Sequence, residues 1–531
     1  MADQELSAVQ LEVVRHALAG VADEMGVALR RSSYSPNIKE RADCSAAVFD
    51  PDGRMVAQAE HIPVHLGAMP RSVEAAIERF GDRLRPGSQV LVNDPYAGGT
   101  HLPDLTLVAV VGDDDGTVLG FVANRAHHAD VGGAAPGSMP ASATDIAMEG
   151  LRIPPILVAT EDGVRGDLLE LVAANSRTPR ERRGDLRAQF AANHVGARRL
   201  RELADRYGVE GLHAAMREVC DYSERRVRAA IADIPDGTYR ASDVLELDDE
   251  VVIAVELTVD GYEVTADFSG SDPQVPANVN AVLAVTASSA YFVLRMLTDP
   301  DAPPNDGCYR PLTVIAEEGT IVHARHPAPV AAGNVETSQR IVDVLLAAFA
   351  QALPDRVPAA SQGTMNNLLL GASDPVAFSY YETLGGGEGA TPDRDGQSGI
   401  HTGMTNTENT PAEAIELDYP LRVWRYELRR DSGGDGDHRG GDGLVREIEV
   451  LSDEATLTLQ TERRANAPRG LHGGGDGATG RNVRVRADGH EEPLAAKGTW
   501  RLRRGDRVRV ETPGGGGWNA PAAPGDAQDD E

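Results

Sequence analysis

Lysine is almost absent from this 531-residue chain, because Lys39 and Lys497 are the only two and arginine supplies the other basic side chains. A P-loop needs a lysine within a Gly-Lys-Ser/Thr sequence, and neither NIKER around Lys39 nor AAKGTW around Lys497 provides one. We therefore expect no ATP site of that kind on this chain. A catalytic Schiff base is also disfavoured, since only these two lysines could form it.

Paired cysteines, long hydrophobic runs and a secretory leader are lacking as well. Cys44, Cys220 and Cys308 are too few for a disulfide framework and fit a reducing cytosol. No hydrophobic run reaches the roughly 18 residues of a membrane span. The beginning of the chain, MADQELSAVQ, has neither a basic region nor an apolar region of a signal peptide. These features predict a cytoplasmic protein that has no membrane partner.

The charge of the chain is strongly one-sided, with 82 acidic and 51 basic residues and a net charge of -31. Without a basic surface, binding to nucleic acid is not expected. Such acidity causes self-repulsion in dilute buffer, whereas at molar salt the Debye length falls to about 3 Å and screens it. The composition therefore predicts a salt-loving cytoplasm. A GC-rich genome would explain the shortage of lysine but not the excess of Asp and Glu.

Residues 91–133 carry the most informative pattern. Two apolar runs, 105–111 and 118–122, flank an Asp/Gly turn at 113–116, which predicts a β-hairpin. Residues of metal-ligand type stand at both outer ends of this hairpin: His101 and Asp104 before it, and His127, His128 and Asp130 after it. Because an antiparallel hairpin brings its outer ends together, we expect these side chains to share one pocket.

Imidazole and carboxylate groups together suit zinc, manganese or iron, and a site with few protein ligands keeps a position open for catalysis. A second predicted hairpin, 45–50 and 55–59, has Asp43 before it and His61 and His65 after it, so Asp43 could complete the metal shell. The alternative is purely structural. The histidines would then fill loops or bond backbone, and Asp104 would cap a turn.

The rest of the chain predicts a mixed α+β protein of several domains. Residues 1–234 would form an N-terminal α+β domain with the metal site, residues 235–380 a central α+β domain, and residues 381–520 a β-rich domain with long glycine loops, before a disordered tail at 521–531. Strands are expected at 421–429 and 447–460. The glycines suit either tight turns, which we take as the default, or close backbone approach.

An arginine-rich stretch precedes the helix predicted over 186–203. Such a stretch could bind a phosphate or carboxylate group, although an ion-paired helix face would give the same pattern. Its arginines are Arg177, Arg180, Arg182, Arg183 and Arg187.

Long motifs in this chain resemble those of the hydantoinase B/oxoprolinase family. In chain order they are KERADCSAAVFD, AEHIPVHLGAM, NDPYAGGTHLPDLTLV, RAHHADVGG, GDLRAQFAAN, DFSGSDPQV, MTNTENTPAEAIE, DSGGDGDHRGG and TPGGGGW. They extend over nearly the whole chain. Asn334 and Gly403 depart from the residues that we expect in the family, which bears on the shape of the substrate.

The resemblance implies the B subunit of an ATP-dependent hydrolase of cyclic amides such as hydantoins, N-methylhydantoins or 5-oxoproline. A separate A subunit would bind ATP and phosphorylate the lactam oxygen, and the B subunit would open the ring through a metal-bound hydroxide, with zinc or manganese as the metal. The implied complex is a hetero-oligomer. A related alternative is a subunit of an acetone- or acetophenone-type carboxylase, and a third is a non-catalytic scaffold for the A subunit.

Carried over to this chain, the family pattern gives the ligands Asp43, His101, Asp104 and His127, with His128 as the alternative to His127. Three further residues receive catalytic roles. His128 and Asp130 would act as bases or orient the ligands, and Arg125 would stabilise the leaving phosphate, with the arginines of 177–187 as the second candidate.

Overall fold

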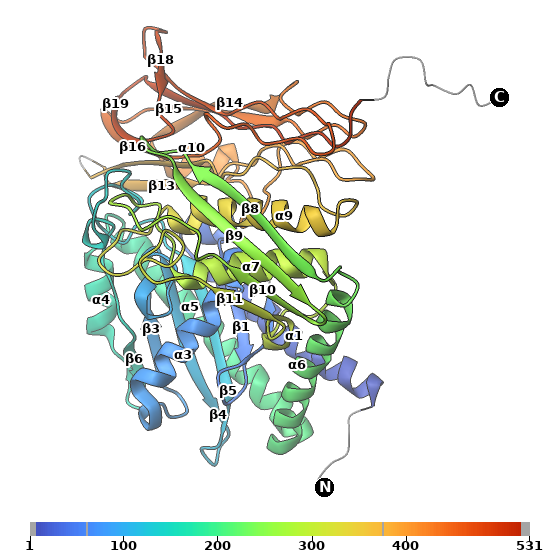
Figure 1. Ribbon diagram of the computed structural model, residues 1–531. Coiled ribbons are helices and arrows are strands. Elements are labelled where there is room, and N and C mark those ends of the chain that lie inside the picture. Colours follow the sequence, from blue (N-terminus) through green and yellow to red (C-terminus); the bar gives the residue numbers. More distant parts are fainter. Residues whose placement is uncertain (1–6, 60–61, 374–375, 522–531) are drawn as a thin grey trace, which may run out of the picture.

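The structure is a computed structural model that describes residues 7–59, 62–373 and 376–521. Three parts are stacked along the molecule (Figure 1): one built on a seven-stranded sheet, one with a four-stranded sheet beside helices, and one with two further sheets. The predicted mixed α+β, multi-domain class is confirmed. None of the described helices is both long and apolar enough to cross a membrane. The predicted disordered tail lies outside the described residues except for Pro521.

The seven-stranded sheet of the N-terminal part is antiparallel throughout. Its strands, in spatial order, are β2 (Met55–Ala59), β1 (Cys44–Phe49), β5 (Val118–His127), β4 (Asp104–Gly112), β3 (Gln89–Val92), β6 (Ile156–Thr160) and β7 (Gly163–Val164). Helices cover both faces: Ala46 and Val48 point into a core shared with α1 (Ala8–Ser32) and α5 (Pro179–Tyr207), whereas Ala47 and Phe49 face a core shared with α3 (Ala68–Phe80). Burial on both faces explains the unbroken apolar runs of β4 and β5.

The other helices of the N-terminal part are short, apart from α6, which follows α5 after a break at Gly208. They are α2 (Pro36–Lys39), η1 (Pro63–His65), η2 (Gly81–Arg83), η3 (Pro95–Ala97), η4 (Ile146–Met148), α4 (Gly166–Ala174) and α6 (Val209–Ile231). Helix α5 is longer than the predicted 186–203 and takes in four of the five arginines of the arginine-rich stretch.

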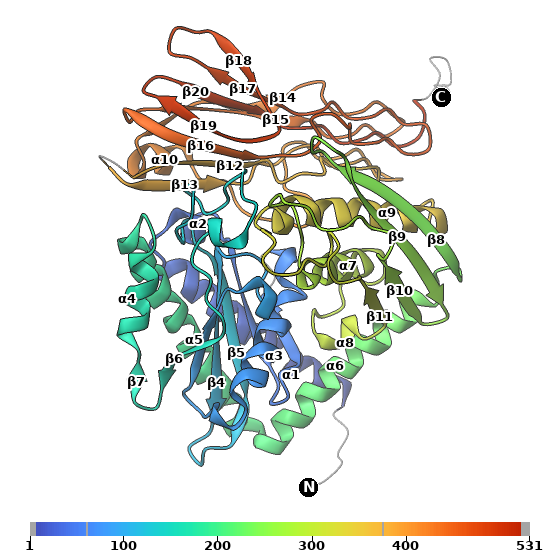
Figure 2. The same ribbon diagram turned by 60° about the vertical axis from the view of Figure 1, so that its left-hand side comes forward.

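The middle part combines a four-stranded sheet with two helices that lie side by side against it (Figures 1 and 2). The sheet order is β11 (Leu312–Ile315), β10 (Glu263–Asp267), β9 (Val251–Asp260) and β8 (Gly237–Leu245), and only β10 and β11 are parallel. The helices are α7 (Leu283–Leu297), the short α8 (Asp306–Tyr309) and α9 (Ser338–Ala352). A π-helical turn, η5 (Gly333–Thr337), leads directly into α9.

Two sheets form the C-terminal part, the uppermost layer in Figure 2. One contains β13 (Phe378–Glu382), β12 (Asn367–Ala372), β16 (Glu454–Gln460) and β19 (Lys497–Arg503). The other contains β14 (Leu421–Arg429), β15 (Gly443–Val450), β20 (Arg507–Glu511), β17 (Arg481–Val485) and β18 (Glu491–Leu494), and helix α10 (Ala412–Asp418) packs on β14. The single strand expected over 447–460 is wrong, because a turn at 451–453 divides it into β15 and β16.

The glycine loops of the C-terminal part interlock. The amide of Gly441 donates to Glu388 O, Gly515 to Gly441 O and Gly434 to Gly515 O, at 2.8–2.9 Å. A Cβ atom on Gly515 would stand 1.9 Å from Glu388 O. Close approach of backbones, and not turn geometry alone, therefore requires glycine at these positions.

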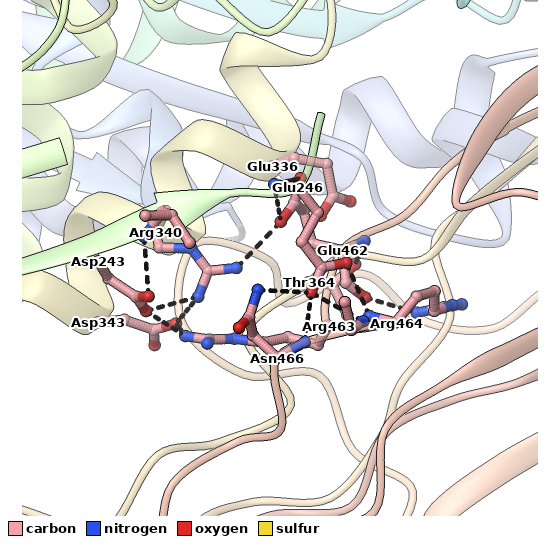
Figure 3. Close-up of polar contacts among 12 residues, drawn as sticks. Asp243, Glu246, Glu336, Arg340, Asp343, Thr364, Glu462, Arg463, Arg464 and Asn466 are labelled. Atoms are coloured by element: carbon pink, nitrogen blue, oxygen red, sulfur yellow. Dashed lines mark hydrogen bonds and ion pairs between the residues drawn. The ribbon is translucent and has the colours of Figure 1, made fainter. Parts of the chain in front are cut away.

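A buried network of ion pairs joins the middle part to the C-terminal part (Figure 3). Arg340 of α9 donates to Asp243 of β8 (Nη1 to Oδ2, 2.9 Å) and to Glu462 after β16 (Nη2 to Oε2, 3.1 Å). Arg463 reaches the same Asp243 oxygen at 2.8 Å, and Lys497 contacts Glu462. Removing one partner of such a pair strands a buried charge, at a cost of about 3–5 kcal/mol, so the network holds the two parts in register.

Glu336 of η5 lies at the edge of this network (Figure 3). One carboxylate oxygen, Oε1, accepts hydrogen bonds from the Met365 amide (3.1 Å) and Asn367 Nδ2 (2.7 Å), and Oε2 has no partner. Burial, followed by the nearby carboxylate of Glu462, raises the pKa of Glu336 to about 8.

Replacing this acid by its amide should remove a pH-dependent loss of stability. Because the pKa of Glu336 is raised from 4.5 to about 8, the folded state binds more protons than the unfolded state between these values, and wild-type stability falls as pH rises through that window. Glu336→Gln keeps the acceptor without the charge. We expect its free energy of unfolding to exceed that of wild type by about 1–3 kcal/mol at pH near 9, and by much less below the unfolded pKa.

Denaturant titrations at both pH values measure this difference. Glu336→Ala is the control, since it removes the acceptor for Met365 and Asn367 and should destabilise the protein at both pH values. A gap between Glu336→Gln and wild type that does not change with pH would contradict the assignment.

Candidate metal centre

Three predicted ligands meet at the outer end of the β4–β5 hairpin. Asp104 begins β4, His127 ends β5, and the two are paired across the strands, while His101 lies in the loop just before β4. Asp104 Oδ1 is 3.3 Å from both His101 Nε2 and His127 Nδ1, and the two nitrogens are 3.2 Å apart. All three side chains are buried. The hairpin therefore gathers a His/Asp/His cluster of the size that holds one metal ion.

Asp104 offers one carboxylate oxygen to this cluster and anchors the other. Oδ2 accepts a hydrogen bond from Thr100 Oγ1 at 2.6 Å and lies 3.5 Å from His65 Nε2, whereas Oδ1 has no hydrogen-bond donor. Burial alone would raise the pKa of Asp104, but the neighbouring His101, His127 and His65 hold it well below the usual range. The site therefore presents an ionised oxygen that a cation can satisfy.

His101 is oriented by a chain of hydrogen bonds from the middle part. Its Nδ1 lies 3.2 Å from Ala331 O, which leaves Nε2 for the cluster. The amides of Val330 and Ala331 donate to the carboxylate of Glu149 at 3.1 and 2.9 Å. This is the arrangement by which outer residues fix the tautomer of a metal-binding histidine.

His127 is held from the C-terminal part. Its ring stacks on Tyr381 of β13, with centroids 4.6 Å apart and planes inclined by 17°. The hydroxyl of Tyr381 donates to Asn367 Oδ1 at 2.9 Å, and the guanidinium of Arg41 lies over the Tyr381 ring, 5.0 Å from its centroid. All three parts of the chain therefore contribute to positioning the cluster.

The cluster borders a small cavity of about 20 Å³, the room needed by an ion or a single water. Asp43 lines this cavity without belonging to the three-residue cluster. His65 lines it too, and its Nδ1 is 2.8 Å from Ser45 Oγ, whereas His61 lies outside the described residues. The remaining lining comes from distant segments and includes Asn334, Met365, Tyr381, Met404, Thr405 and Thr407. Apart from the departure noted at Asn334, the sequence singles out none of these six.

The three residues expected to be catalytic lie away from the cavity lining. His128 Nε2 is 3.0 Å from Gln189 Oε1 of α5, and burial, reinforced by the charge of Arg182, lowers the pKa of His128 to about 3. Asp130 accepts hydrogen bonds from the amides of Gly132 and Gly137 and pairs with Arg177 at 2.9 Å. Both contacts are of a kind that stabilises the fold.

Arg125, the expected phosphate ligand, is also engaged elsewhere. It is fully buried and donates to Thr106 Oγ1 and Ser72 Oγ, each at 2.8 Å, and burial lowers its pKa to about 10. In the arginine-rich stretch, Arg182 pairs with Asp185 at 3.1 Å and Arg183 with Glu170 at 2.8 Å. These pairs match the ion-paired alternative for that stretch.

The fold and the cluster define a class whose solved members include an enzyme that acts on a lactam. The ATP-dependent caprolactamase from Pseudomonas jessenii matches with a TM-score of 0.90 and 29% identity, over 98% of this chain and 92% of that chain. Acetone carboxylase in its nucleotide-free structure matches with a TM-score of 0.87 over 96% of this chain and 75% of that chain. At 19% identity, the second likeness concerns the fold alone.

The chain belongs to the hydantoinase B/oxoprolinase family, whose model matches residues 7–521. It is 40% identical to 5-oxoprolinase 1 of Arabidopsis thaliana over 98% of this chain, and 32% identical to a putative B subunit of a D-/L-hydantoinase from a Pseudomonas species over 98% of this chain and 91% of the relative. The chain spans only 42% of the length of the Arabidopsis protein. The resemblance drawn from the motifs is confirmed.

Replacing Asp104 by Asn should abolish cation binding. The amide keeps the shape of the side chain but lacks the ionised oxygen, so we expect the affinity of the metal-stripped chain for Mn²⁺ or Zn²⁺ to fall by at least about 100-fold in isothermal titration calorimetry. Asp130→Asn is the matched control, because Asp130 is equally buried but pairs with Arg177. It should lower stability and leave cation affinity unchanged. Equal losses in the two variants would contradict the assignment of the cluster.

Proposed function

We propose that this chain is the B component of an ATP-dependent cyclic-amide hydrolase and that it opens a lactam ring activated on a separate A-type subunit. The observation that carries the proposal is the buried cluster of His101, Asp104 and His127. It lies in a chain whose fold extends over nearly all of an ATP-dependent caprolactamase. Hydantoins and 5-oxoproline, the rings named by the family, are cyclic amides as well.

A larger cavity beside the cluster would hold the ring. It has a volume of about 510 Å³, within the range of about 300–1,000 Å³ typical of small-molecule sites, and Thr405 lines both this chamber and the cluster cavity. Phe292, Met296 and Leu346 give it an apolar wall. Polar lining comes from Ser361, Gln339, Thr402 and Asn406. Such a chamber suits a compact ring with one polar edge directed at the cluster.

The residues of the cluster fit a divalent cation. When bound, the ion would supply Lewis acidity, which polarises an oxygen and lowers the pKa of water toward about 7. The chain itself supplies position and dryness. Asp104 contributes a buried negative charge, His101 and His127 are held in fixed orientations, and the surrounding side chains keep bulk water from the reacting bond.

ATP would act on the partner subunit. The two lysines offer no P-loop, and the names of the relatives join ATP dependence with a subunit organisation. An anionic group that reaches the chamber would meet Arg356 or Arg394, which line it. They are better placed for this than Arg125, whose hydrogen bonds go to Thr106 and Ser72.

The alternative is a subunit of an ATP-dependent carboxylase of the acetone or acetophenone type. The fold likeness to acetone carboxylase, with a TM-score of 0.87, favours keeping it in view. A carboxylase requires bicarbonate as a co-substrate and a hydrolase does not, so turnover with and without bicarbonate separates the two.

Activity of the reconstituted complex tests the proposal. The chain would be co-expressed with an A-type partner and assayed at high salt with ATP and hydantoin, N-methylhydantoin, 5-oxoproline or caprolactam. We expect ring opening that depends on ATP, is independent of bicarbonate and is lost by at least about 100-fold in a complex carrying Asp104→Asn. Ring opening is followed by chromatography and ATP hydrolysis by release of phosphate.

Two results would count against the proposal. Turnover of a ketone only in the presence of bicarbonate would place the chain on the carboxylase branch. Full ring-opening activity in the Asp104→Asn complex would leave this chain as a scaffold for its partner.

A further inference from the structure

Asn334 lies against the cluster but is not part of the ligand set expected for the chain. Its side chain is buried, with 4% exposed, and lines the small cavity. Nδ2 is 3.2 Å from His101 Nε2, and Oδ1 has no hydrogen-bond partner. An unpartnered amide oxygen inside a closed cavity is costly unless something in the cavity meets it.

The backbone around Asn334 is held firmly in place. The residue belongs to the π-helical turn η5, a rare conformation that occurs often at functional sites. Gly333 packs so closely that a Cβ atom there would stand 1.8 Å from Asn280 O, and Ser338 Oγ donates to Asn334 O at 2.8 Å. On the other side of the turn, Glu336 is anchored to Met365 and Asn367. The turn therefore aims the Asn334 amide at one spot.

The contact between Asn334 and His101 cannot persist once a cation binds. His101 Nδ1 faces Ala331 O, so the free lone pair of the ring is on Nε2, and Asn334 Nδ2 donates to that lone pair. A cation held by Nε2 uses the same lone pair. The amide then loses its only side-chain partner, and both of its polar ends are left buried in the cavity.

A half-turn of the amide about its Cβ–Cγ bond resolves this conflict, because it exchanges the positions of Nδ2 and Oδ1. The oxygen then stands where the amide nitrogen stood, beside the atom that holds the cation. We propose that Asn334 is a neutral oxygen ligand of the ion bound by His101, Asp104 and His127. The inference rests on the metal centre proposed above and not on the identity of the ring substrate.

An amide oxygen is a fitting donor at this place. Amide and carboxylate oxygens are hard ligands that suit manganese and similar cations, and a neutral ligand adds to the coordination without adding negative charge to a buried site. The cavity of about 20 Å³ holds an ion but not a ring, which favours contact of Asn334 with the ion over contact with the substrate.

Cation binding by the metal-stripped chain tests this role without any partner subunit. Titration with Mn²⁺ and with Zn²⁺ should show affinity lowered by about 10- to 100-fold in Asn334→Ala. Asn334→Asp, which keeps an oxygen at the same place, should bind as tightly as wild type or more tightly. With Co²⁺ as a probe, the visible absorption of Asn334→Ala should change as the ion loses a ligand, and that of Asn334→Asp should stay close to wild type.

Asn305→Ala is the matched control, because Asn305 is a fully buried amide that donates to Ser223 Oγ at 2.9 Å, outside the cavity lining. It should lose stability without losing cation affinity. Thermal unfolding in the presence of a chelator shows whether each variant is folded, and Asn334→Asp remains informative if Asn334→Ala does not fold.

The outcomes separate the inference from the proposals on which it rests. If Asn334 only donates a hydrogen bond to His101, Asn334→Asp will lose affinity as Asn334→Ala does, and the ligand role is overturned. Unchanged affinity in both variants overturns it as well. A wild-type chain that binds neither cation would refute the metal centre itself, whereas ring-opening activity is not needed for any of these results.

Discussion

The register of strands β4 and β5 is the constraint on which the rest of the site depends. Asp104 stands opposite His127 because both strands are buried on two faces, so a slip of one residue would move every apolar side chain to the wrong face of the sheet. The same register sets Arg125 opposite Thr106, where its guanidinium ties the two strands to α3. Apolar packing along the whole hairpin thereby fixes the positions of the polar groups at its end.

This polar end lies where the three parts of the chain meet. The loop before β4 brings His101, the segment before η5 brings Ala331 O, and β13 brings Tyr381. Each contact is made by a different part, and the ion pairs of Arg340 keep the middle and C-terminal parts from shifting relative to one another. Precise positioning of a few ligands is in this way distributed over a large and well-packed structure.

Local pattern was sufficient to predict the hairpin, the helices around it and the gathering of His101, Asp104 and His127. It could not decide which of the adjacent His127 and His128 faces the cavity, because both follow the same strand and only tertiary packing turns His128 toward Gln189. Asp130 looked like a ligand for the same reason, although Arg177 and two loop amides satisfy it.

Contacts between distant segments were beyond the reach of local pattern. Tyr381 is about 250 residues from His127, and no periodicity in the sequence relates them. The glycine loops show the same limit from another side. A run of glycines suits a turn and a backbone contact equally well, and only the positions of Glu388, Gly441 and Gly515 in space decide between the two.

The interlocked glycine loops have a consequence for the order in which the chain assembles. Residues 514–517 follow every strand of the C-terminal part, yet they thread between backbone segments near 390, 434 and 475 and form hydrogen bonds with all three. Until the ribosome has released residues 514–517, those segments lack these partners for their amides and carbonyls. This short stretch thus works as a closing pin, so that a chain interrupted before it would keep the region open and remain recognisable to proteases as unfinished.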